Sequence, residues 1–230
     1  MHISHPTSRL PTLLAAMALS ACASGHGTMQ SSAVVRSPSG AVDPAYVTKA
    51  RADSMRLPYT AKDVEFMSHM IGHHAQAIAM SRWAPTHGAS PAVQRLADRI
   101  INAQQDEIAT MQRWLRDRNQ SVPEAKPMPM KMNMNGMVHE MLMPGMLTEA
   151  QMKELDQARG AEFDRLFLTS MIRHHQGAVS MVKQLFDSYG AGQDETVFKF
   201  ASDVNVDQST EIARMQKMLA DLLLGPSAAN

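Results

Sequence analysis

Residues 63–80 read DVEFMSHMIGHHAQAIAM, and residues 164–181 read DRLFLTSMIRHHQGAVSM. Both copies follow the frame D-x-x-F-x-x-x-M-I-x-H-H-x-x-A-x-x-M. In the first copy Phe66, Met70, His73, Ala77 and Met80 recur at steps of four and three residues, which predicts one face of an α-helix. The sequence therefore contains two related helices that each carry a histidine doublet among methionines.

The repeat continues into the helix that follows each copy. Residues 104–112 read QQDEIATMQ and residues 208–216 read QSTEIARMQ, which share the pattern Q-x-x-E-I-A-x-M-Q. The repeated unit is thus a pair of helices, and neither pair can bury its apolar stripe alone. We expect an all-α fold, a four-helix bundle built from two repeated helix pairs.

Capping residues and prolines predict where the helices begin. Thr60 with Asp63 forms a capping-box signature, and Ser90 before Pro91 marks the start of the next helix. Long helices are expected at about 61–84, 91–122, 162–189 and 194–224, with Gly190 as a C-cap and a short helix after Thr148.

Between the two copies lies a segment of different character, residues 119–147. Its methionines at first occupy every second position, and its prolines and glycines oppose a long helix. We interpret it as a mobile loop over the bundle that offers further soft-metal ligands, and the alternative is a packed loop or a promiscuous surface for a protein partner. The candidate ligands in this loop are Met128, Met130, Met132, Met134, Met137, His139, Met141, Met143 and Met146.

The first residues have the pattern of an export signal. Arg9 precedes an apolar run at 10–19 that is too short to span a bilayer and ends in Leu-Ser-Ala-Cys at Cys22. This ending resembles the bacterial lipoprotein cleavage box, which implies a signal peptide at 1–21, a lipidated Cys22 and, because Ala23 is not aspartate, the periplasmic side of the outer membrane. The alternative is an ordinary signal peptide with an incidental Cys22.

Composition limits the domains and partners that we expect. Residues 22–42 are rich in Ser, Gly and Pro and are expected to form a flexible tether, followed by the bundle domain at 43–226. The 22 basic and 22 acidic residues are interspersed, so no nucleic-acid partner is expected. A single cysteine excludes an intrachain disulfide framework and a zinc–thiolate cluster.

The two-helix pattern, M-I-x-H-H-x-x-A-x-x-M followed by Q-x-x-E-I-x-x-M, resembles the bacterial domain-of-unknown-function-305 family. The resemblance implies a ferritin-like four-helix fold and export, and for some members copper binding or tolerance. It carries over these motif positions as candidate metal ligands: Met70, His73, His74, Met80, Met171, His174, His175 and Met181. As possible ligands, or as residues that orient the ligands, it carries over Glu107, Met111, Glu211 and Met215.

This chain departs from the family pattern near both doublets. Gly72 and Arg173 stand where members often have proline before the histidines. The first copy has Ala75-Gln76 where the second has the more typical Gln176-Gly177. These changes affect the bend of the helices and the direction of the imidazoles.

Imidazole and thioether groups together are typical ligands for a soft cation. Copper(I) accepts both, silver(I) binds similarly, and copper(II) prefers the histidines with oxygen donors. Adjacent helical residues point about 100° apart, so only one histidine of each doublet can face the bundle axis. The periodicity selects His73 and His174 as the inward pair.

A reading without metal accounts for much of the same pattern. Methionines on an apolar stripe are ordinary core residues, and a single buried histidine usually has a hydrogen-bonding partner. Glu107 and Glu211 on the paired helices are the natural partners, and in a metal site they would instead orient the imidazoles.

These observations leave three hypotheses for the function. The first is a periplasmic metal-binding protein, not an enzyme, that buffers copper(I) or silver(I) or delivers it to a copper-transport partner protein. The second is a non-metal bundle for structure or interaction. The third is a ferritin-like metalloenzyme, which the absence of Glu-x-x-His from the doublet helices disfavours.

Overall fold

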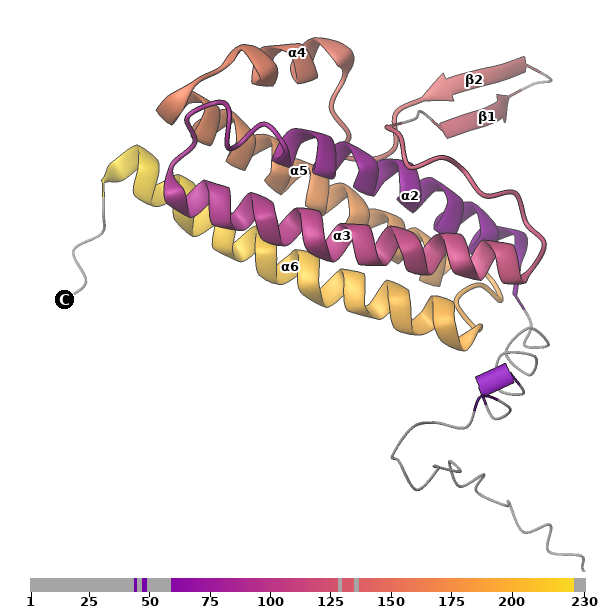
Figure 1. Cartoon of the computed structure of the whole chain (residues 1–230). Coiled ribbons are helices and arrows are strands. Elements are labelled where there is room, and N and C mark those ends of the chain that lie inside the picture. Colours follow the sequence, from indigo (N-terminus) through magenta and orange to yellow (C-terminus); the bar gives the residue numbers. More distant parts are fainter. Residues whose placement is uncertain (1–43, 45–46, 49–58, 128–129, 135–136, 226–230) are drawn as a thin grey trace, which may run out of the picture. The chain divides into compact units, whose positions relative to one another are not determined.

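The computed structural model describes residues 44, 47–48, 59–127, 130–134 and 137–225. Four long helices lie alongside one another (Figure 1): α2 (Ala61–Ser81), α3 (Pro91–Asp117), α5 (Gly160–Asp187) and α6 (Glu195–Leu224), with the short α4 (Glu149–Gln157) beside them. α2 packs on α3, α5 packs on α6, and α2 with α5 joins the pairs. The expected four-helix bundle of two helix pairs is confirmed. The expected signal peptide and tether lie outside the described residues.

Most predicted helix starts are confirmed. Thr60 and Asp63 form the capping box of α2, with Thr60 N donating to Asp63 Oδ2 at 2.6 Å. Ser90 caps α3 by accepting from Val93 N at 3.4 Å, and Thr148 caps α4 in a second capping box. The expected end of α5 differs, because that helix ends at Asp187 with Ser188 as its C-cap rather than at Gly190. In the described part of the chain no helix has the length and apolar character needed to cross a bilayer.

The buried residues form two hydrophobic clusters, one on each side of the histidine doublets. The first contains early residues of α2 and late residues of α5, such as Met70 and Met181, together with residues of α3 and α6. The second holds the late residues of α2 and the early residues of α5, including Met80 and Met171. This pairing means that α2 and α5 run antiparallel, so both doublets lie at the level where the two clusters meet.

Two aspartates form hydrogen bonds that connect the two repeats. Asp63 of α2 accepts a hydrogen bond from Gly192 N at 2.7 Å, in the connection between α5 and α6. In the same way Asp164 of α5 accepts from Ser90 N at 3.2 Å, at the start of α3. Both carboxylates are buried, and a charged acceptor strengthens such bonds. Each repeat therefore fixes the interhelical turn of the other.

The methionine-rich segment differs from the expected irregular loop. β1 (Met130–Met134) and β2 (Met137–Met141) form an antiparallel hairpin whose register places Met132 opposite His139. The loop interpretation is therefore wrong for these strands, because a spacing of two residues is the period of a β-strand. Met143 and Met146 are 2% and 6% exposed and belong to the first hydrophobic cluster. The loop candidate Met128 lies outside the described residues.

Residues 143–147, which we call the strap, lie against both doublet helices. The Gln76 side chain holds Leu147 twice, donating to its carbonyl at 2.9 Å and accepting from its N–H at 2.8 Å. On the other side Gly177 makes room, since a Cβ there would lie 1.9 Å from Pro144 O. The two copies thus differ at equivalent positions, Gln76 and Gly177, because both residues contact the strap, one by hydrogen bonds and the other by leaving space for it.

Replacing Gly177 with alanine is expected to displace the strap and to lower the free energy of unfolding by about 1–3 kcal/mol, the usual cost of overpacking. Chemical denaturation measures this. Gln176→Ala is the matched control, because the neighbouring Gln176 is exposed on the same helix. Equal stability of the two variants would contradict the close contact.

Candidate metal centre

The four doublet histidines are fully buried at the centre of the bundle. The rings of His73 and His174 meet across the α2–α5 interface with their centroids 3.8 Å apart. They are the pair that the periodicity placed inward. His74 and His175 are turned toward α3 and α6 instead, with ring centroids 6.4 and 6.2 Å from those of their neighbours in the chain.

Each outer histidine of a doublet contacts a glutamate of the paired helix. His74 Nε2 lies 2.6 Å from Glu107 Oε2, and His175 Nε2 lies 2.8 Å from Glu211 Oε2. An ionised carboxylate only accepts hydrogen bonds, so each Nε2–H donates to its glutamate, and Nδ1 is the nitrogen that carries the lone pair of the neutral ring. The glutamates therefore fix the tautomer and the orientation of both rings.

The inner histidines also have ring nitrogens without a partner. His73 Nε2 donates to Pro144 O of the strap at 3.0 Å, which leaves its Nδ1 as an acceptor. Within the described residues, no hydrogen-bond partner is found for Nδ1 of any doublet histidine or for Nε2 of His174. A buried acceptor without a partner is costly. Because a neutral imidazole has one acceptor nitrogen, the four rings present four unpartnered acceptors in one layer, and a metal ion would satisfy several of them at once.

Burial keeps the inner imidazoles neutral. Because the charged form is poorly solvated in the interior, burial lowers the pKa of His73 to about 3. Burial, followed by the neighbouring His73, likewise lowers the pKa of His174 well below its ordinary value. A neutral ring needs no deprotonation before it binds a metal, so both rings are ready to bind at neutral pH.

The methionines named from the sequence are buried next to this layer. Met70, Met111 and Met181 lie in the first hydrophobic cluster. Met80, Met171 and Met215 lie in the second. All six also fill the core as apolar side chains, so their role as ligands stays a prediction.

The donor set fits a soft cation better than a hard one. Among the described residues, no three His, Cys, Asp or Glu side chains are gathered into a ready-made metal site. The groups at hand are imidazoles and buried thioethers, which suit copper(I) and silver(I). The two nearest carboxylates, Glu107 and Glu211, are already hydrogen-bonded to imidazole.

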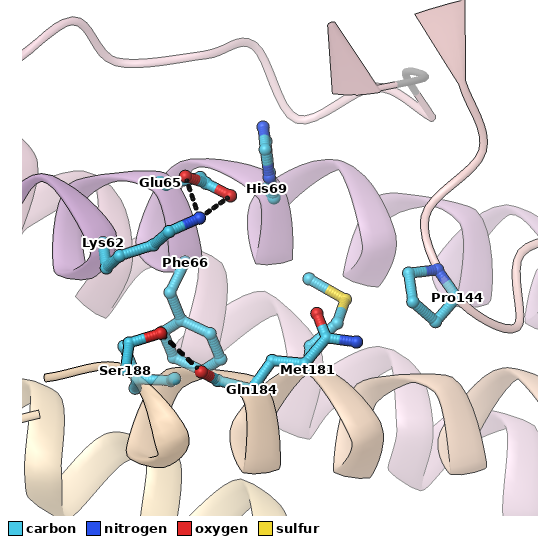
Figure 2. A pocket seen from close by; sticks show the side chains of 9 residues that line it. Lys62, Glu65, Phe66, His69, Pro144, Met181, Gln184 and Ser188 are labelled. Atoms are coloured by element: carbon cyan, nitrogen blue, oxygen red, sulfur yellow. Dashed lines mark hydrogen bonds and ion pairs between the residues drawn. The ribbon is translucent and has the colours of Figure 1, made fainter. Parts of the chain in front are cut away.

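A hollow of about 290 Å³ opens beside the strap, over the seam of α2 and α5. Figure 2 shows Met181 and Pro144 on its wall, with Lys62 paired to Glu65 at its rim. Pro144 links this hollow to the centre, because its carbonyl contacts His73. His69 also lines the hollow, and the second copy has Ser170 at the equivalent position.

Sequence reasoning missed three residues that shape the centre. Pro144 supplies the acceptor for His73, while Gln76 and Gly177 hold the strap in place. The departures between the two copies at residues 75–76 and 176–177 were the available signal. The sequence suggested that they alter the bend of the helices and the direction of the imidazoles, whereas in the structure Gln76 and Gly177 accommodate the strap.

The chain belongs to the family described as Domain of unknown function (DUF305), whose sequence model matches residues 63–219. This range spans both helix pairs. It includes all four doublet histidines and both glutamates that contact them.

Several solved structures are similar to this chain. A DUF305 protein from Streptomyces coelicolor, thought to be secreted, is 28% identical, with 74% of this chain and 97% of that chain covered and a TM-score of 0.58. A DUF305 fragment from Deinococcus radiodurans is 30% identical, with coverage of 71% and 98% and a TM-score of 0.58. CopM in its Cu(I)-bound form is 26% identical, with coverage of 71% and 98% and a TM-score of 0.53. CopM has also been solved in Cu(II)-bound and Ag-bound forms.

The chain is also similar to a protein known from its sequence. A protein of Acanthamoeba polyphaga mimivirus is 39% identical over 56 residues, which cover 24% of this chain. The match spans 37% of that protein's length, so it relates a segment of the two proteins.

The metal-free protein is expected to become less stable as the pH is lowered. Lowered pKa values mean that the folded state binds fewer protons than the unfolded state between about 6.5 and about 3 for His73. The free energy of unfolding should therefore decrease as the pH is lowered through this range, by at most about 1.4 kcal/mol per pH unit for each inner histidine.

Urea denaturation between neutral pH and the acid range measures this dependence. Carboxylates elsewhere in the protein also make the free energy of unfolding depend on pH. The wild type is therefore compared with a variant in which His73 and His174 are both replaced by leucine. The variant is expected to have a shallower slope. An identical slope in the two proteins would show that the inner imidazoles are not held neutral by burial.

Proposed function

We propose that this protein binds copper(I) or silver(I) in the histidine layer and buffers or delivers the ion, without a catalytic step. The observation that carries the proposal is the layer itself, in which five buried ring nitrogens lack a partner among the described residues. The Glu107 and Glu211 carboxylates and the Pro144 carbonyl hold three of the four rings from outside. The unpartnered nitrogens thus lie in the interior, in the same bundle core as the buried thioethers.

The similarity to CopM supports the same conclusion. CopM has been solved with Cu(I), Cu(II) and Ag bound, and each of these structures covers about 70% of this chain. Identities of 26–28% leave the metal and the ligands of this chain to experiment. The ligands that we propose are the four doublet histidines, with thioethers drawn from Met70, Met80, Met171 and Met181.

A titration of the chain lacking residues 1–21 with Cu(I), against a chelator of known affinity, tests the proposal. Replacing His73 and His174 together with leucine is expected to weaken binding by at least about tenfold, or about 1.4 kcal/mol. His87→Gln is the matched control, because His87 is also buried but lies outside the layer and contacts Asp156. Equal affinity of the double variant and the wild type would refute the histidine site.

A purely structural bundle is the second candidate, and the two histidine–glutamate contacts favour it. A buried histidine that is hydrogen-bonded to Glu107 or Glu211 fixes the register of its helix pair without any metal. Thermal unfolding separates the two candidates. A bound ion stabilises the folded state by about 2.7 kcal/mol at a free concentration of 100 Kd, whereas the structural bundle would unfold at the same temperature with and without Cu(I).

We also propose that the protein is exported and anchored to the outer membrane through a lipid on Cys22. The support is the sequence signal at 1–22 together with the Streptomyces coelicolor relative, which is thought to be secreted. Incorporation of radiolabelled palmitate in cells should be lost in a Cys22→Ser variant. A wild-type chain without label would rule out the anchor, although an ordinary signal peptide would still export the protein.

A further inference from the structure

A second feature of the bundle lies on the face opposite the strap contacts, between α3 and α6. Two adjoining hollows of about 480 and 540 Å³ open there and share Glu107 and Asp207 in their walls. We call them together the outer groove. The histidine layer and the strap do not account for it.

The outer groove is strongly acidic. Its walls carry six carboxylates, Asp106, Glu107, Glu195, Asp203, Asp207 and Glu211. The cationic side chains in the same walls are Arg99, Lys199 and Arg214, and Lys199 is paired with Asp203. The excess of negative charge attracts cations and raises their local concentration.

The carboxylates in the middle of the groove repel one another electrostatically. Burial, and then the neighbouring charges of Glu107, Asp203 and Glu211, raise the pKa of Asp207. Glu107 and Glu211 each have one oxygen on a buried histidine, yet their side chains remain 21% and 24% exposed. They therefore connect the groove to the interior, and Asp207 lies within electrostatic reach of both.

The groove also has unpartnered acceptors that do not belong to the acidic cluster. Gln104 and Gln208 occupy equivalent positions in the two repeats, are each 3% exposed and line the same hollow. Among the described residues, Oε1 of each amide lacks a hydrogen-bond donor. A buried amide oxygen without a donor is costly, and a cation in the groove would remove that cost in both repeats at once.

We propose that the outer groove binds an oxygen-preferring divalent cation through the carboxylates of Asp207, Glu107 and Glu211 and the amide oxygens of Gln104 and Gln208. Carboxylate and carbonyl oxygens are the ligands that such cations select. The described carboxylates do not form a ready-made cluster of three ligands, so this site requires the two amide oxygens and a movement of the carboxylate side chains towards the cation. This site goes beyond the soft-metal function, because its donors are oxygens and it does not require copper in the histidine layer.

Mn(II) is the probe, because it prefers oxygen to thioether ligands and its free aquo ion is quantified by electron paramagnetic resonance. The wild-type chain is expected to bind Mn(II), and Asp207→Asn to weaken that binding about tenfold. Gln104→Met, which removes an unpartnered acceptor and keeps the volume, should weaken it as well. Asp221→Asn is the matched control, since it removes a carboxylate of the same helix outside the groove and should bind like the wild type.

Two outcomes overturn the proposal. One is an absence of Mn(II) binding by the wild-type chain. The other is an equal loss in the Asp207→Asn and Asp221→Asn variants, which would indicate unspecific attraction by charge. Cu(I) uptake is measured in parallel. If the Asp207→Asn variant binds Mn(II) more weakly but takes up Cu(I) like the wild type, the groove site is separate from the histidine layer. If the soft-metal proposal is wrong, the wild-type chain itself will not bind Cu(I).

Discussion

The burial of four imidazoles in one layer is the constraint on which the rest of the structure depends. An uncharged histidine in a dry interior needs an acceptor for its N–H and a donor or a metal for its lone pair. For His73, His74 and His175 the bundle supplies the acceptor from outside the layer, with the Pro144 carbonyl, Glu107 and Glu211. The second requirement is unmet among the described residues, and this imbalance is the strongest indication that the layer holds something.

The duplication of the helix pair explains how the layer arises. Antiparallel packing of α2 on α5 brings the two doublets to one level, between the two hydrophobic clusters. The cross-repeat bonds from Asp63 to Gly192 N and from Asp164 to Ser90 N set that level. The two copies differ where the strap crosses them, so a nearly symmetric bundle has one covered side, with the hollow of Figure 2 beside the strap.

Much of the fold was predictable from the sequence. Periodicity and capping boxes placed the helices, and the repeat identified the helix pairs. The inward direction of His73 and His174 followed from the 100° step between adjacent residues. The glutamates followed from their place in the second motif. All of these depend on local geometry or on the repeat.

The rest depended on contacts between segments far apart in the chain. The hairpin was interpreted as an irregular loop because Gly136 and the flanking prolines at 127, 129 and 144 outweighed its two-residue spacing. Pro144 and His73 are 71 residues apart in the chain, and no local sequence pattern predicts their contact. The outer groove joins residues of α3 and α6 that come close only when the two repeats pack.

Anomalous diffraction at the copper edge, from crystals grown with Cu(I), tests the central claim most directly. The account predicts copper bound by ring nitrogens of the doublet histidines, with His74 and His175 still contacting their glutamates. Copper found only at the hairpin or the surface, with the histidine layer unchanged, would contradict it.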